Sequence, residues 1–334
     1  MPKTQASRRA RDYARYTGAP RQLACDVVAS LAPGAPLIPT PTQHAQLLFE
    51  SEIFYQILGT QRHYFEYPLG IRYVEPTADG VRLHLDSSKS LDSLLRGLLP
   101  RRVSHNNRKR DEIYGLYGVR ICARTDHGIE LRRLGQPTSL KLTGLSRRAF
   151  ARAEAKLLRW AEEDGAEACW RAEGDWTACE RQWDVERQPL IYVSTWRDAA
   201  WLPSGLLRRL GLLHTVAVPQ IVTGHEARLG ELWILRLDHF PDTGLRRAEL
   251  VEALTDPDNG LPLQLQGHRK LVPGGSLGLV LLKAADGTAL QLRYDRLDHP
   301  VKNRAETCAA IRHRISKITG EAALPPMPDG RASC

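Results

Sequence analysis

The sequence predicts an α+β protein built from repeated β-hairpin–helix units, with antiparallel sheets in two domains. Four pairs of strand-like segments are each joined by a short turn, and each pair is followed by a segment with helical periodicity. Because a lone hairpin is only marginally stable, we expect the helices to cover one face of each sheet. The hairpins and their helices are predicted at 64–85 with 87–98, 118–134 with 146–160, 215–238 with 246–254, and 276–294 with 302–318.

Turn and helix-cap residues in the sequence support the predicted bounds of these units. Asp79-Gly80 and Asp286-Gly287 indicate hairpin turns, because Gly readily takes the positive φ that tight turns require. Ser87 and Ser146 each precede an apolar stripe and are expected to cap a helix. A further short strand is predicted at 139–142.

Composition changes along the chain suggest where the domains begin and end. The segment 33–41 has four prolines and is typical of an extended linker, and 162–186 has nine acids against two arginines. If the halves 60–165 and 206–318 are related by a pseudo-two-fold axis, their strand orders should match. The predicted division is 1–34 basic helical arm, 35–165 first hairpin–helix domain, 166–205 Trp-rich acidic connector, 206–320 second hairpin–helix domain, and 321–334 disordered tail.

The charge balance favours an acidic partner. The formal net charge is +9, which is typical of proteins that bind nucleic acid. An arginine-rich composition with 9 lysines among 47 basic residues is also what a GC-rich genome produces. The six cysteines form no CxxC pair, which favours reduced thiols in a cytoplasm. No apolar run approaches the ~18 residues that span a bilayer, so no membrane partner is expected.

Three basic segments lead to the first functional prediction, which is binding of nucleic acid, in particular DNA. They are the N-terminal segment 4–31 with its two helix-compatible stretches, the loop 101–111 and the helix 302–317. Arginine and lysine side chains are the usual partners of phosphate oxygens. The alternatives are a solvated basic arm and an exposed loop that charge keeps soluble. The predicted phosphate contacts are Arg8, Arg9, Arg11, Arg101, Arg102, Arg108, Lys109, Arg110, Lys302, Arg304 and Arg312.

A repeated Arg-Leu-Asp-His segment leads to a second hypothesis, a metal-dependent phosphodiesterase or nuclease. It occurs at 236–239 and 296–299, in each case where a strand is expected to end. Asp238 and Asp298 could bind one Mg²⁺ or Mn²⁺, the cofactor of such an enzyme, and His239 and His299 could act in catalysis. Against this, neighbouring residues of a strand point to opposite faces. The alternative is that each Asp caps a turn or pairs with a nearby Arg.

A third hypothesis is a non-catalytic subunit that contacts a protein partner through the Trp-rich connector. Packing inside the chain or between domains is the alternative role for its tryptophans. No phosphate-binding lysine loop, dinucleotide fingerprint or nucleophile elbow is present. The tryptophans concerned are Trp170, Trp176, Trp183, Trp196 and Trp201.

Overall fold

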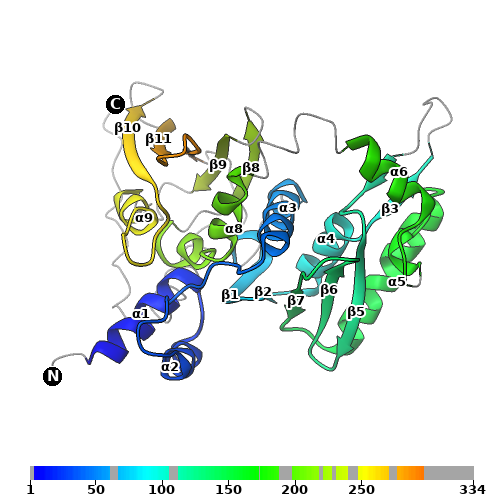
Figure 1. The fold of residues 1–334 in the computed structure, drawn as a ribbon, viewed down its shortest axis with the longest axis horizontal. Helices are drawn as coiled ribbons and strands as arrows, with labels where there is room; N and C mark the ends of the chain where they lie inside the picture. Colours follow the sequence, from blue (N-terminus) through cyan, green and yellow to red (C-terminus); the bar gives the residue numbers. More distant parts are fainter. Residues whose placement is uncertain are drawn as a thin grey trace, which may run out of the picture.

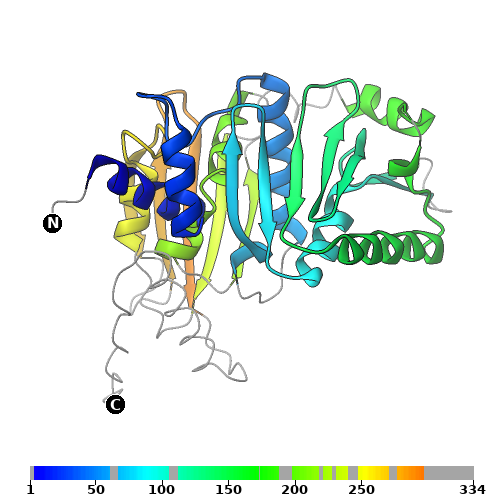
Figure 2. The same cartoon turned by 90° about the horizontal axis from the view of Figure 1, so that it is seen from below.

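A computed structural model of the chain contains two five-stranded sheets in separate regions of the sequence (Figures 1 and 2). The helices and antiparallel-rich sheets confirm the α+β prediction. The structure describes residues 4–60, 67–104, 112–172, 174–187, 198–217, 221–227, 231–239, 247–270 and 277–296.

The N-terminal segment forms the two predicted helices, α1 (Gln5–Thr17) and α2 (Arg21–Ser30). The Thr4 side chain caps α1, and Gly18, with φ 77°, ends it in the left-handed conformation. The inner face of α1 is buried, and the Tyr16 hydroxyl donates a hydrogen bond of 2.9 Å to the Ala253 carbonyl in the second half. The segment is therefore a packed helical pair and not a solvated arm.

The first sheet has the strand order β1-β2-β7-β6-β5. Its β2 and β7 run parallel, and its other neighbours are antiparallel. Two amphipathic helices, α4 (Ser88–Leu98) and α5 (Arg147–Glu163), begin at the predicted caps Ser87 and Ser146. The strands are β1 (Ile71–Thr77), β2 (Gly80–Leu85), β5 (Val119–Thr125), β6 (Gly128–Arg133) and β7 (Leu140–Thr143).

The second sheet has the order β10-β11-β12-β9-β8, again with a single parallel junction, between β9 and β12, among the described strands. Helix α9 (Arg247–Leu254) lies between β9 and β10 in the sequence. The strands are β8 (Ile221–Ala227), β9 (Leu232–His239), β10 (Gln264–Lys270), β11 (Leu277–Lys283) and β12 (Ala289–Arg296).

The two sheets have the same topology. Each begins with a hairpin, continues through a helix and ends with a three-stranded meander whose last strand lies parallel to the second strand of the hairpin. The strand orders of the two halves match in the described residues, as the pseudo-two-fold hypothesis requires. All four predicted hairpins are present, whereas the fourth helix, 302–318, lies outside the described residues.

Three details of the strand prediction were wrong. The segment predicted as the loop 101–111 begins with a strand, β3 (Arg101–Val103), which pairs with the unpredicted β4 (Glu112–Tyr114) in a separate two-stranded sheet. The segment predicted to begin β8 at 215 instead forms a short π-helical turn, η3 (Leu213–Ala217), in which the Thr215 hydroxyl donates to the Gly211 carbonyl at 3.0 Å. Strand β10 was not predicted. It is a polar edge strand without the apolar alternation on which the strand predictions relied.

Helix α3 (His44–Thr60) lies between the two halves, next to α4 on one side and α8 (Trp201–Leu207) and β8 on the other (Figure 1). The buried Glu50 of α3 accepts hydrogen bonds from Arg208 at 2.7 and 2.6 Å and from Ser204 at 2.7 Å. Buried apolar side chains of both halves form one continuous core. The halves are therefore joined through packed and charged contacts.

The acidic connector is docked on the edge of the first sheet. Its buried Glu180 forms an ion pair of 2.7 Å with Arg120 of β5. Within the described part of the chain, no helix is long and apolar enough to cross a membrane. The remaining elements are η1 (Pro68–Gly70), β3 (Arg101–Val103), β4 (Glu112–Tyr114), η2 (Cys169–Arg171) and α6 (Ala178–Arg187).

Candidate functional site

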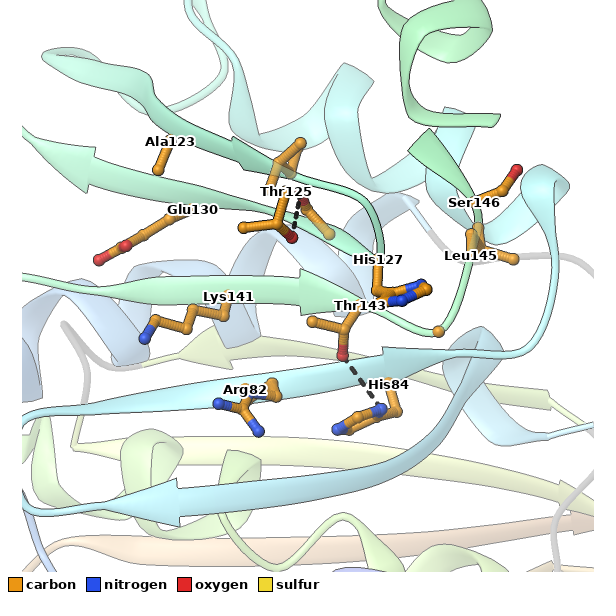
Figure 3. A pocket seen from close by; sticks show the side chains of 13 residues that line it. Arg82, His84, Ala123, Thr125, His127, Glu130, Lys141, Thr143, Leu145 and Ser146 are labelled. Carbon is orange, nitrogen blue, oxygen red and sulfur yellow. Dashed lines mark hydrogen bonds between the residues drawn. The ribbon is translucent and has the colours of Figure 1, made fainter. Parts of the chain in front are cut away.

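A cavity of about 700 Å³ lies on the face of the first sheet that its helices leave uncovered (Figure 3). Four strands, β2, β5, β6 and β7, and the start of α5 line it. This volume is in the range of small-molecule sites. The cavity is thus large enough for a ligand of nucleotide size.

Because successive side chains of a strand point to opposite faces of the sheet, alternate polar residues of β2 and β7 face the cavity. On β2, Leu83 is buried against the helices, whereas Arg82 and His84 face the cavity. On β7, Lys141 and Thr143 face it for the same reason. The parallel pairing sets Arg82 beside Lys141 and His84 beside Thr143.

Two of these side chains, His84 and Thr143, form a hydrogen-bonded chain with Glu75 of the neighbouring strand β1. Nε2 of His84 contacts the Glu75 carboxylate on β1, and Nδ1 of His84 lies 3.0 Å from the Thr143 hydroxyl. An ionised carboxylate can only accept, so Nε2 carries a proton. In the neutral imidazole, Nδ1 then accepts the Thr143 hydroxyl proton. Glu75 thus orients the His84 ring, and the ring is hydrogen-bonded to the Thr143 hydroxyl, as a general base is to a nucleophile.

The environment fixes the charge and the ring orientation in this chain. Burial alone would raise the pKa of Glu75, but the hydrogen bond from His84, the charge of that ring when it is protonated, and the positive charge of Arg82 lower it below its usual value. The Tyr73 ring stacks on the His84 ring, with centroids 3.8 Å apart. Glu75 is therefore ionised near neutral pH, and His84 is held in one orientation.

Two cations of the cavity are suited to an anionic ligand. Arg82 is paired with Glu75 at 2.9 Å but keeps 40% of its side chain exposed. Lys141 is exposed and has no carboxylate within 4 Å among the described residues. The nearby Glu130 is already paired with Arg132 at 2.7 Å.

The start of α5 forms the rim of the cavity. Ser146 lines it and caps the helix, and the exposed side chains of Arg147 and Arg148 follow in the first turn. Gly144, with φ 94°, turns the chain there, and a Cβ on it would lie 2.9 Å from the Leu85 carbonyl. The rim thus adds two cations beside the sheet.

The described residues that were predicted to bind phosphate lie outside the cavity. Arg8 and Arg11 are exposed on α1, while Arg9 donates to the Ala35 carbonyl at 2.8 Å. Arg101 and Arg102 lie in β3, where Arg102 pairs with Glu167 at 2.7 Å. None of these five residues lines the cavity. The other six, Arg108, Lys109, Arg110, Lys302, Arg304 and Arg312, lie outside the described residues.

The structure describes two of the four residues of the Asp-His hypothesis, Asp238 and His239. Strand β9 continues through His239, so Asp238 and His239 point to opposite faces of the sheet. The strand register sets Asp295, which was not predicted, beside Asp238. Asp298 and His299 lie outside the described residues. The register of β9 and β12 therefore sets 236–238 beside 293–295 and not beside 296–298.

Arg236 binds both carboxylates of this second sheet. Its Nε lies 2.8 Å from Asp238 and 2.6 Å from Asp295. Burial raises the pKa of Asp238, and Asp295 adds to this effect, whereas Arg236 opposes it. In the described residues, no three His, Cys, Asp or Glu side chains form a group that could hold a metal ion. A metal-dependent reaction at Asp238 stays a prediction.

The described tryptophans of the connector contact their own chain. Trp170 is buried, and Trp176 packs on the Tyr117 ring with centroids 5.6 Å apart. Trp201 donates to Asp286 at 2.9 Å. A protein partner of the connector stays a prediction.

Sequence reasoning missed the cavity although a signal was present. Polar residues alternate with leucines at 82–84 and 140–143, which indicates a polar sheet face. The alternation did not indicate that these two segments pair as neighbouring strands. Comparisons with protein-family models, curated proteins and solved structures found no match to the chain.

Proposed function

We propose that this protein binds nucleic acid and that the open face of the first sheet contacts its phosphates. The observation that carries the proposal is the cavity in which Arg82 and Lys141 lie side by side on parallel strands. Arginine and lysine supply most phosphate contacts in such complexes. The net charge of +9 favours the same class of partner.

The shape of the site favours a single strand of DNA or RNA over a duplex. A cavity of about 700 Å³ accepts one flexible segment of backbone. The exposed Arg147 and Arg148 at its rim would meet neighbouring phosphates. Proteins that bind single strands commonly combine such a basic surface with little sequence preference.

The variant Arg82→Ala/Lys141→Ala is expected to bind a fluorescent single-stranded oligonucleotide more weakly at every salt concentration. Losing two phosphate contacts should reduce the slope of log K against log[salt] by about 1.4, since each contact to a single strand contributes about 0.7. Fluorescence anisotropy of DNA and RNA oligonucleotides over a salt series measures both quantities.

The matched control is Arg21→Ala/Lys283→Ala, which removes the same charge from exposed positions away from the cavity. It should lower affinity only slightly. Equal losses in the two variants would show that the overall charge, and not the cavity, attracts the ligand. No binding by the unmodified protein at low salt would remove the proposal.

A further inference from the structure

We propose that Thr143 is a nucleophile that attacks phosphodiesters, with His84 as its general base and Glu75 as the residue that positions His84. The inference deepens the proposed function, since it gives the same cavity a reaction on the phosphate that it binds. It rests on side-chain geometry around one cavity.

The three side chains follow each other across three adjacent strands. Glu75 on β1 contacts Nε2 of His84 on β2, and Nδ1 of His84 faces the Thr143 hydroxyl on β7 at 3.0 Å. Both His84 and Thr143 line the cavity, so a ligand there can reach the hydroxyl (Figure 3). A nucleophile, a base within hydrogen-bond reach and a third group that orients the base are the parts of an activated nucleophile.

The cations beside the chain favour a phosphodiester over a neutral ester. Arg82 precedes His84 by two residues on the same face of β2, and Lys141 does the same before Thr143 on β7. A phosphodiester carries one negative charge, and its transition state is stabilised by such groups. The substrate class is therefore a phosphodiester of DNA, RNA or a smaller nucleotide.

A second histidine lies on the other side of Thr143. Gly128 of β6 is the register partner of Thr143, and His127 precedes it in the β5–β6 turn. Figure 3 shows His84 and His127 on opposite sides of Thr143, and both line the cavity. In an in-line displacement the attacking and leaving oxygens are on opposite sides of phosphorus. In the proposed step His127, which lines the same cavity, protonates the leaving oxygen.

The step balances without a further reactant. The Thr143 Oγ1 attacks phosphorus and passes its proton to Nδ1 of His84. The phosphorus bond to the leaving oxygen breaks, and that oxygen takes a proton from the His127 imidazolium. The products are a free hydroxyl and a phosphodiester joined to Thr143. Attack by water or another hydroxyl reverses these transfers and releases Thr143.

The test uses the full chain and bis(p-nitrophenyl) phosphate, which reports the reaction without any need for nucleic-acid binding. We expect a burst of p-nitrophenolate and a matching mass increase on the peptide that contains Thr143. Thr143→Val should lower the burst rate at least ~100-fold, the lower end of what general-base catalysis contributes. Thr143→Ser should keep it.

Thr223→Val is the matched control, because it removes a hydroxyl from β8 of the second sheet, outside the cavity. It should react at the rate of the unmodified protein. An unmodified protein that gives neither burst nor adduct would overturn the inference, as would a Thr143→Val variant that reacts normally. Oligonucleotide binding is measured separately, so its loss would remove the proposed function alone.

The role of Glu75 is tested by comparing Glu75→Gln with Glu75→Asp. In Glu75→Gln, the His84 ring loses the negatively charged partner of Nε2, whereas Glu75→Asp keeps a carboxylate there. We expect a slower burst in Glu75→Gln at an unchanged KM for bis(p-nitrophenyl) phosphate, and partial recovery of the burst rate in Glu75→Asp. Equal burst rates in the two variants would show that Glu75 supports the sheet and does not position the base.

Discussion

Replacing Arg208 by methionine is expected to lower the free energy of unfolding by about 3–5 kcal/mol, the usual cost of leaving one partner of a buried ion pair alone. The side chains of Arg208 and Glu50 are 1% and 0% exposed. Arg208 also donates to the backbone carbonyls of Pro39, at 2.5 Å, and Thr77, at 2.8 Å. Urea unfolding followed by far-UV circular dichroism and tryptophan fluorescence measures the loss.

Arg181→Met is the control, because Arg181 pairs with Asp175 at 2.9 Å while both side chains are more than half exposed. Exposed pairs contribute about 0–1 kcal/mol, so this variant should be close to the unmodified protein. An Arg208→Met variant as stable as Arg181→Met would mean that this ion pair does not hold the two halves together.

Replacing Glu180 by alanine is expected to detach the acidic connector from the first sheet at a cost of about 3 kcal/mol. The Glu180 carboxylate accepts hydrogen bonds from Arg120 at 3.0 and 2.7 Å, from the Gly118 amide at 2.8 Å and from the Thr177 amide at 2.9 Å. All of these groups would lose a buried partner. Faster tryptic cleavage within 166–187 would report the detachment.

This contact also gives the connector a pH dependence. Burial would raise the pKa of Glu180, but Arg120 and the two amides lower it below its usual value. A carboxyl group with a lowered pKa in the folded state stabilises that state fully above its unfolded pKa of about 4.3, and this contribution is lost as the pH falls through the folded pKa.

The connector should therefore become more sensitive to an acid-active protease below about pH 4. The Glu180→Gln variant should be sensitive at all pH values, with little change across this range. Glu154→Gln is the control, since Glu154 pairs with a half-exposed Arg124. An unmodified connector that is equally resistant at pH 3 and pH 6 would contradict the account.

The hairpins could be predicted because turn residues and apolar periodicity are local signals. At Asp286-Gly287 the turn has the expected positive φ at glycine, since Gly287 has φ 95°. At Asp79-Gly80 the prediction was correct for a different reason. Gly80 is not among the positive-φ residues, and a Cβ there would lie 2.8 Å from the Ser139 carbonyl of the neighbouring chain segment. The glycine allows a close approach that sequence alone does not reveal.

The register of the second sheet could not be predicted for a related reason. The repeated Arg-Leu-Asp-His suggests that 236–239 and 296–299 are equivalent, but β9 and β12 align Asp238 with Asp295. Inward positions decide the register, since Leu237 and Tyr294 are both buried. The repeated motif does not show which of its side chains are buried.

The candidate site depends on contacts that are distant in the sequence. Glu75 and His84 belong to one hairpin, but Thr143 joins them only because β7 returns to pair with β2. Basic loops stand out in a sequence, whereas single cations on alternating strand positions do not. Arg101 and Arg102 could therefore be singled out from the sequence, whereas Arg82 and Lys141 could not.

Hydrogen exchange of the full chain, with and without a saturating single-stranded oligonucleotide, tests the central claim most directly. We predict slower exchange in β2, in β7 and in residues 144–148 at the start of α5 when the oligonucleotide is bound. Protection confined to 101–110 or 302–317, with β2 and β7 unchanged, would contradict the assignment of the open face of the first sheet as the binding site.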